Sequence, residues 1–167
     1  MASLQCRGWK LSAWSIDNVS ATAAERIDNG CKACSVIVET DVVERGDDIT
    51  HHIKGQFTCN SRNIIYLIRC AKNCDDAWYV GETKQTLRGR LIGHRQDITT
   101  GKTFKPIGEH FNLPGHSSDD LRVTILQGHI KDTCLRRAIE QKLVDKLNTH
   151  KRGLNIDRGC MSHYTLN

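Results

Sequence analysis

Long apolar runs are absent from this 167-residue chain. The longest, Ile64 to Ile68, is far shorter than the roughly 20 residues that a transmembrane helix needs. The first residues also lack the continuous apolar segment that directs secretion. These two absences predict an intracellular protein without a membrane span. Internal repeats and low-complexity tracts are absent as well, which excludes a solenoid or a repetitive fibrous chain.

Charge and cysteine content narrow the classes that remain. The net charge of +5 suits a polyanionic partner, although it is equally ordinary on a protein that binds a neutral ligand. Eight cysteines accompany eight histidines. Without a secretory signal, this combination favours reduced thiols and metal ligation over a disulfide framework, so Zn²⁺ becomes a candidate ligand. The length suits one domain of roughly 100 to 150 residues plus an extension.

Residue patterns divide the chain into four segments. We expect a loosely ordered leader, a Cys/His-rich lobe, a main domain and a C-terminal tail at residues 1–30, 31–60, 61–157 and 158–167. Within the lobe, residues 35–40 predict a strand, and residues 45–48 predict a turn before His51 and His52.

The main domain mixes strand-like and helix-like patterns, which predicts an α/β fold. Two β-branched segments, 64–68 and 78–81, predict an antiparallel pair joined by a cysteine-bearing loop, and 121–126 predicts a third strand. Thr83 or Thr86 can cap a helix that runs to about Ile98.

Two further helical pieces follow in the sequence. Residues 104–113 form a short amphipathic piece that Pro114-Gly115 ends. The longest helix opens at Asp132 or Thr133, and Gly153 supplies its stop. Its expected buried face consists of Leu135, Ile139, Leu143, Val144 and Leu147.

Arg90 and His94 stand four residues apart on the first predicted helix. This spacing places both side chains on one face, with their Cβ atoms about 6 Å apart, so both can act on one phosphate. Cleavage of a phosphodiester needs a positioned water, a base, positive charge near phosphorus and stabilisation of the leaving oxyanion. Taken alone, an Arg-His pair on a helix is more often a solvated face.

Around that pair, an ordered series of residues resembles the GIY-YIG nuclease family. Tyr66 and Tyr79 stand where the two motif tyrosines stand. The series continues with Gly81-Glu82-Thr83, Leu87 and Arg90, then Arg137 to Leu147 around Glu140, and Gly153-Leu154-Asn155. Ile64 and Leu143 depart from the family's glycine and tryptophan, at positions that supply no chemistry. The resemblance implies a small fold with a central three-stranded antiparallel sheet flanked by helices.

The resemblance also implies roles for six residues. Glu140 would bind the catalytic Mg²⁺ or Mn²⁺, and Arg90 would neutralise the nonbridging phosphate oxygens. Tyr79 is the preferred group to orient or deprotonate water, with Tyr66 and His94 relaying the proton, while the identity of the base stays open. Asn155 would support the site. Each residue alone has a simpler interpretation as a packing residue, a helix-surface charge or a helix stop; the ordered series over about ninety residues favours the nuclease.

Cysteines and histidines form two candidate zinc sites. Cys70, Cys74, His110 and His116 have the ligand types of a tetrahedral site, although loop thiols and a turn-capping histidine are the simpler interpretation. Residues 59–157 are also similar to the endonuclease domain of Penelope-like retroelements, through Tyr66 to Cys70, Tyr79 to Thr83, Gly108 to Phe111 and Pro114 to His116. That resemblance implies a Cys-Cys-His-His zinc motif at these four residues. A second, structural Zn²⁺ site is expected at Cys31, Cys34, Cys59 and His52 or His51.

Basic residues gather around the first and last predicted helices. We expect phosphate contacts from Lys84, Arg88, Arg95, Lys102 and Lys105, and from Arg136, Arg137, Lys142, Lys146, Lys151 and Arg152. A basic helix face is usually just solvated, so proximity to the nuclease motif carries this expectation.

The leading hypothesis is a metal-dependent DNA endonuclease. In the setting that the resemblance implies, it nicks target DNA in the nucleus for target-primed reverse transcription, with DNA, element RNA or a reverse transcriptase domain as partners. The alternatives are a zinc-stabilised nucleic-acid-binding module with a silent nuclease site, and a repair or junction-resolving nuclease of the same family. Without a base-reading module, we expect little sequence preference.

Overall fold

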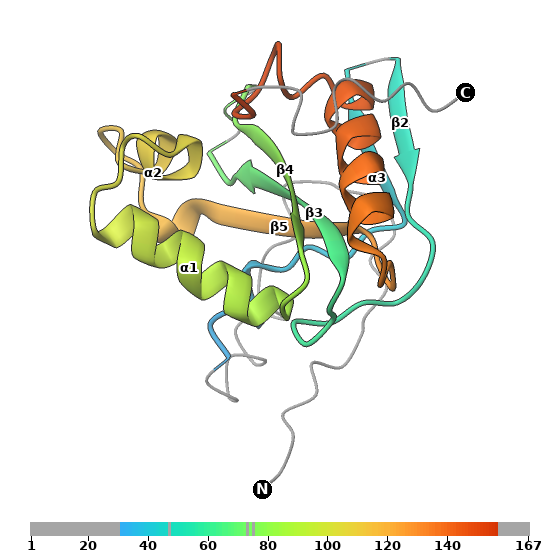
Figure 1. The fold of residues 1–167 in the computed structure, drawn as a ribbon. Coiled ribbons are helices and arrows are strands. Elements are labelled where there is room, and N and C mark those ends of the chain that lie inside the picture. Colours follow the sequence, from blue (N-terminus) through green and yellow to red (C-terminus); the bar gives the residue numbers. More distant parts are fainter. Residues whose placement is uncertain (1–30, 47, 73, 75, 157–167) are drawn as a thin grey trace, which may run out of the picture.

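The computed structural model describes residues 31–46, 48–72, 74 and 76–156. Its centre is a three-stranded antiparallel sheet in the order β4-β3-β5 (Figure 1), which confirms the predicted α/β class and the three predicted strands. The strands are β3 (Ile64–Cys70), β4 (Trp78–Thr83) and β5 (Leu121–Gln127). The expected leader 1–30 and tail 158–167 lie outside the described residues. None of the described helices is long and apolar enough to cross a membrane.

β3 is the central strand, and both of its faces are buried. Successive side chains on a strand point to opposite faces. Tyr66 and Ile68 accordingly lie in one hydrophobic core, whereas Ile65 and Leu67 lie in another. Ile64, which departs from the family's glycine, belongs to the first core and is fully buried. The apolar run of β3 therefore serves two cores at once.

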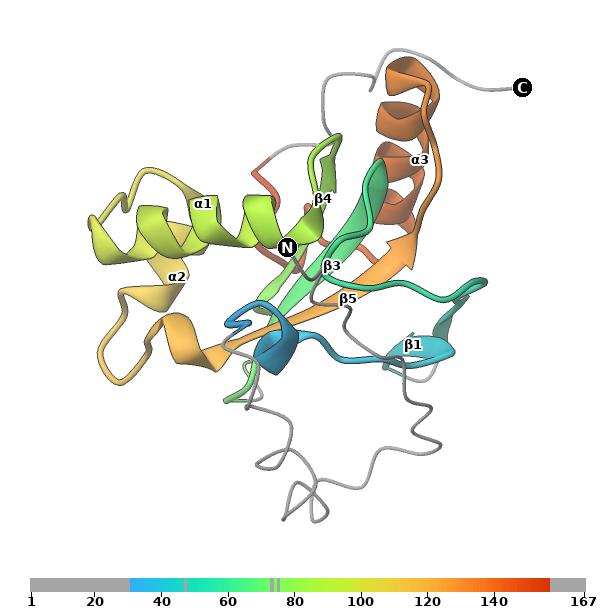
Figure 2. The same ribbon diagram turned by 90° about the horizontal axis from the view of Figure 1, so that it is seen from below.

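Helices cover the two faces of the sheet separately (Figure 2). α1 (Leu87–Thr99) and α2 (Pro106–Phe111) contribute to the core around Tyr66, and α3 (Thr133–Lys146) contributes to the core around Leu67. Side chains cap the two longer helices. Thr86 accepts a hydrogen bond from the N–H of Gly89. Asp132 accepts one from the N–H of Leu135. Both caps agree with the sequence prediction.

Residues of the segment 31–60 pack into both cores. A 3₁₀ turn, η3 (Cys34–Val36), lies against the core of α1, and Ile37 forms a single parallel bridge with Val123. The predicted strand at 35–40 is therefore wrong. The first strands are instead β1 (Val42–Arg45) and β2 (Ile49–His52), an antiparallel pair whose Val43 lies in the core of α3.

The buried face of α3 differs from the prediction at one position. Leu143 and Leu147 are buried as expected, but the side chain of Leu135 is 51% exposed. Arg136 is buried in its place. A buried arginine at this position requires a partner inside the protein, and Glu82 of β4 supplies one.

Candidate active site and metal centres

Three residues predicted for catalysis meet at one phenolic oxygen. Tyr66 Oη, at the centre of β3, lies 2.8 Å from His94 Nε2. The Nε–H of Arg90 donates to the same oxygen over 2.9 Å. α1 presents both residues because they are one turn apart on the face that packs against β3. The face of α1 that carries Arg90 and His94 therefore points toward the interior of the protein and is not simply a solvated helix face.

Tyr79 completes the cluster from the neighbouring strand. Its side chain also hydrogen-bonds Arg90. The ring of His94 lies edge-on to both tyrosine rings, with centroids 5.9 Å apart in each case. Gly81 makes this approach possible, because a Cβ there would lie 2.7 Å from Tyr66 Oη and 2.8 Å from Tyr79 Cε1. Any larger residue at position 81 would push the two phenols apart.

Glu140 approaches the cluster from α3, along the edge strand β4. Its carboxylate accepts a hydrogen bond from the backbone N–H of Glu82. Burial, and then the negative charge of Glu82, raise the pKa of Glu140 from 4.5 to about 7. The negative charge of Glu140 raises the pKa of Tyr79, and the charge of Arg90 lowers that of Glu140. The carboxylate is thus electrostatically part of the same site.

Asn155 acts on the backbone of β4. Its side-chain Nδ2 donates to the carbonyl of Val80, and its Oδ1 accepts from the N–H of Val80, both over 2.9 Å. The amide thereby imitates a neighbouring strand at an edge that would otherwise be open. Because Val80 follows Tyr79, Asn155 holds the strand that carries the second tyrosine. Asn155 itself does not lie among the phenols.

Burial sets the protonation states in the cluster. Desolvation, and then the charge of Arg90, lower the pKa of His94 to about 3, so the imidazole is neutral at neutral pH. Desolvation raises the pKa of Tyr66 and of Tyr79 above the ordinary phenol value. Because Arg90 already donates to Tyr66 Oη, the phenol's own proton is free to be donated to neutral His94. The raised pKa of Tyr79 makes it a better group for orienting water than for deprotonating it.

The arrangement has the parts that phosphate chemistry uses. Arg90 is a fixed cation, Glu140 is an oxygen donor for a hard divalent cation, and the phenols with His94 form a proton path. Each alone is ordinary in a protein interior. Their convergence from β3, β4, α1 and α3 onto one spot is the feature that supports the sequence-based interpretation.

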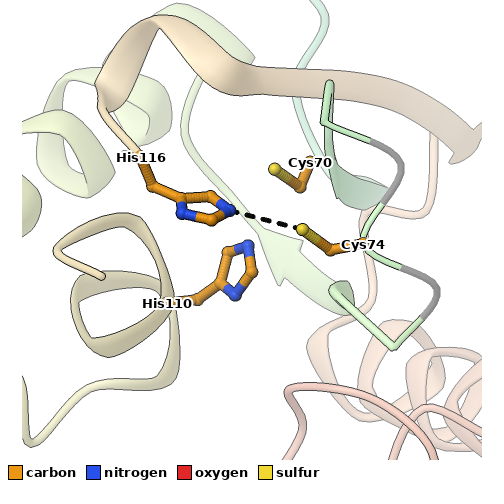
Figure 3. Close-up of side chains that lie close together, drawn as sticks. All are labelled: Cys70, Cys74, His110 and His116. Atoms are coloured by element: carbon orange, nitrogen blue, oxygen red, sulfur yellow. Dashed lines mark hydrogen bonds between the residues drawn. The ribbon is translucent and has the colours of Figure 1, made fainter. Parts of the chain in front are cut away.

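The four residues of the first expected zinc site are brought together (Figure 3). Their ligand atoms, two sulfurs and two ring nitrogens, all lie within 4.8 Å of one another. The end of β3 supplies Cys70, and the loop after it supplies Cys74. α2 supplies His110, and the segment after α2 supplies His116. Cys74 Sγ lies 3.3 Å from His116 Nε2, close to the roughly 3.5 Å edge of a tetrahedron with zinc bond lengths. A metal ion fits this group.

The environment of this group agrees with metal ligation. Burial, and then the neighbouring His116, lower the pKa of His110, which favours the neutral imidazole that a metal requires. The buried Nε2 of His110 has no hydrogen-bond partner among the described residues. The backbone N–H of Lys72 donates to Cys70 Sγ over 3.4 Å, an outer contact that fixes a ligand sulfur.

A second group contains only sulfur among the described residues. Cys59 Sγ lies 3.8 Å from Cys31 Sγ and 3.6 Å from Cys34 Sγ, separations that match the edge of about 3.8 Å in a zinc-thiolate tetrahedron. The expected histidine ligand does not join the group. His52 lies on β2, and His51 Nε2 lies 3.4 Å from the carbonyl of Leu126.

Several residues expected at DNA phosphates have partners inside the protein. Arg88 donates to the sulfurs of Cys31 and Cys59 over 3.4 and 3.6 Å. Lys102 and Lys105 share the carboxylate of Asp97, at 3.1 and 2.7 Å. Arg136 is buried against Glu82, and Arg95 is half-buried. Lys84 is exposed in the loop before α1. The basic residues thus offer fewer free charges than their number suggests.

Sequence reasoning missed Glu82 and Arg136 as partners of the site. Arg136 precedes Glu140 by one helical turn, a spacing that could have indicated a shared face. Glu82 alternates with Tyr79 and Gly81 on β4, so it points to the opposite side, toward α3.

Comparisons with known proteins identify no relative: the scan of family models, the search of curated proteins and the search of solved structures each found no match.

Proposed function

We propose that this chain is a divalent-metal-dependent endonuclease that hydrolyses phosphodiester bonds in DNA by the chemistry of the GIY-YIG family. One observation carries the proposal: Tyr66 Oη contacts both His94 and Arg90 at hydrogen-bond distance. One partner would satisfy the hydroxyl of a packing tyrosine, whereas this hydroxyl meets both a half-buried arginine and a neutral histidine. The charges of Glu140 and Arg90 both act on the pKa of Tyr79, which supports a shared site.

Each residue of the cluster has its own role in the proposed hydrolysis. Arg90 binds the nonbridging oxygens of the scissile phosphate and offsets the charge that develops there. Tyr79 orients the attacking water, and the water's proton leaves along Tyr66 Oη to His94 Nε2. Gly81 keeps the two phenols close, and Asn155 holds the strand that carries one of them.

Glu140 would hold the catalytic cation. Its carboxylate is the kind of oxygen donor that Mg²⁺ and Mn²⁺ prefer, and a divalent cation would offset the burial that raises its pKa. When bound, such a cation supplies Lewis-acid stabilisation of the phosphate and the leaving oxygen. Zn²⁺ at Cys70, Cys74, His110 and His116 would serve a structural purpose, because soft sulfur ligands suit zinc and the group joins the loop after β3 to α2.

The retroelement setting is the finer part of the proposal. It has one support, the similarity of residues 59–157 to Penelope-like endonuclease domains. In that setting the enzyme nicks one DNA strand in the nucleus and exposes a 3′ hydroxyl for reverse transcription, with element RNA and a reverse transcriptase domain as partners. A junction-resolving enzyme would share the chemistry but prefer branched DNA.

Purified protein incubated with supercoiled, linear and branched DNA in Mg²⁺ or Mn²⁺ tests the function and its alternatives together. We expect nicked circles from supercoiled DNA, no product in EDTA, and a loss of about 10²- to 10³-fold in rate for Arg90→Ala. Lys131→Ala is the control, because Lys131 is an exposed cation outside the cluster and is not among the residues expected at DNA phosphates. Folded protein that binds every DNA form and cuts none would identify a binding module, and faster cutting of branched DNA would identify a junction-resolving enzyme.

A further inference from the structure

Glu140 reaches the cluster through a contact with β4, and a partly buried ion pair lies beside that contact. The side chain of Glu82 forms the pair with Arg136, whose Nε lies 2.5 Å from Glu82 Oε2. The backbone N–H of the same Glu82 donates to the carboxylate of Glu140. One residue of β4 therefore contacts two residues of α3 that are one helical turn apart.

The guanidinium of Arg136 makes contacts through all three of its nitrogen atoms. Its side chain is 2% exposed. Besides Glu82, its Nη1 donates to the carbonyl of Ile130 over 3.0 Å and its Nη2 to Thr133 Oγ1 over 3.4 Å. The carbonyl belongs to the segment before α3, and the hydroxyl belongs to its first residue. The guanidinium thus joins the entry of α3 to β4 in a fixed geometry.

The ion pair between Glu82 and Arg136 also has an electrostatic effect on Glu140. Glu82 and Glu140 are two carboxylates at one site, and like charges at short range repel. Arg136 holds the Glu82 carboxylate by a short charged bond, and Arg137 adds a longer contact of 3.9 Å from an exposed side chain. With its side chain held in this way, Glu82 offers Glu140 only its N–H.

We infer that Glu82 and Arg136 are positioning residues for Glu140: their ion pair fixes α3 on β4 so that the Glu140 carboxylate is held at the cluster, ready for a cation. This inference rests on the proposed function, because it gives the pair a purpose in metal binding. Glu82 itself does not bind the cation, since its carboxylate oxygens are occupied by arginine. Arg136 does not contact DNA, because it is buried.

Three variants separate positioning from simple stability. Arg136→Met removes the guanidinium but keeps an apolar stem, and leaves the Glu82 charge uncompensated. Glu82→Gln/Arg136→Met removes both charges, and replacing both members of a buried pair often restores stability. Lys131→Met is the control, because it removes an exposed positive charge just before α3 that forms no ion pair with either carboxylate among the described residues.

The readouts are the Mn²⁺ concentration for half-maximal nicking, thermal denaturation, and hydrogen exchange at the Glu82 amide. We expect both Arg136 variants to need about 10- to 100-fold more Mn²⁺, the usual effect of losing an outer contact to a metal ligand. We expect the double variant to regain thermal stability without regaining metal affinity. Lys131→Met should match the wild type in all three measurements.

Hydrogen exchange keeps this inference separate from the nuclease activity. The Glu82 amide should exchange faster in Arg136→Met and in the double variant, whether or not the protein cuts DNA. Inactive wild-type protein with this exchange pattern would overturn the proposed function and leave the positioning intact. A double variant with wild-type stability, exchange and Mn²⁺ dependence would show that the pair is only structural, and would overturn the inference.

Discussion

Tyr66 Oη and His94 Nε2 lie 2.8 Å apart in the interior of the protein, between the central strand and the helix that follows it. Arg90 donates to the same oxygen. Through this contact, two residues of a sequence motif form one hydrogen-bonded unit, in which a phenol bonds a neutral imidazole and a guanidinium donates to the same phenol oxygen. Loss of the hydroxyl should therefore affect both stability and chemistry.

Tyr66→Phe tests this unit. The substitution removes the only side-chain atom that joins Arg90 to His94, and it leaves buried polar groups with fewer partners, so stability should fall by about 1–3 kcal/mol. Nicking should fall by roughly 10²-fold or more. Tyr79→Phe is the comparison, because that hydroxyl bonds Arg90 but its ring meets His94 only edge-on, so activity should fall with a smaller loss of stability. Urea denaturation and single-turnover nicking measure both quantities; wild-type nicking by Tyr66→Phe would remove it from the chemistry.

Glu140→Gln should change the pH dependence of stability in metal-free protein. Because the pKa of Glu140 is raised from 4.5 to about 7, its contribution is fully present below pH 4.5 and is lost as the pH rises through 7. Glutamine cannot ionise but can still accept from the N–H of Glu82. The variant should therefore be more stable than the wild type at pH 8, by roughly 2 kcal/mol, and similar at pH 4.5. Equal stability curves at both pH values would show that the carboxyl is not perturbed.

The zinc content should be two ions per chain when the protein is purified under reducing conditions. Elemental analysis should find that Cys74→Ser loses one ion, from the Cys70, Cys74, His110 and His116 group, and that Cys59→Ser loses the other. Cys134→Ser is the control, because this exposed cysteine belongs to neither group and its variant should keep both ions. Protein without zinc would remove both sites from the account, and one ion insensitive to Cys59→Ser would remove the second.

Gly81→Ala should disrupt the site by steric crowding alone. The added Cβ would lie 2.7 Å from Tyr66 Oη, so the phenols must move, at a cost of about 1–3 kcal/mol. Nicking should fall sharply without any change in ionisable groups. Gly93→Ala on α1 is the matched control, because its Cβ would meet nothing within 4 Å, and it should stabilise the helix by about 0.5–1 kcal/mol. An active Gly81→Ala protein would contradict the geometry of the phenols.

The sequence could predict the elements that short-range patterns control. Strands β3, β4 and β5 were readable from β-branched runs, and the caps Thr86 and Asp132 from local chemistry. The strand expected at 35–40 is instead a 3₁₀ turn followed by extended chain, because Val36 packs into the core and only Ile37 pairs with a strand. Tertiary packing determines the conformation of this segment, and no local sequence pattern predicts it.

In the candidate site too, short-range patterns predicted some features, and tertiary packing determined the others. The four-residue spacing of Arg90 and His94 predicted that they share one helical face. The cysteine and histidine content predicted the ligand types of the zinc group. Composition could not show which basic residues face the solvent. Arg88 and Arg136 look alike in the sequence, yet one lies against sulfur and the other against a half-buried carboxylate. Such pairings join residues 29 and 54 positions from their partners, Cys59 and Glu82, and only the folded chain reveals them.

Single-turnover nicking of supercoiled DNA in Mn²⁺, compared between the wild type and Glu140→Gln, tests the central claim most directly. Glutamine keeps the shape and the hydrogen bond from Glu82 but removes the charge that would hold the cation. The account predicts metal-dependent nicking by the wild type and a rate about a thousandfold lower in the variant, the equivalent of roughly 4 kcal/mol in the barrier. Equal nicking by the two folded proteins, or none by either, would contradict it.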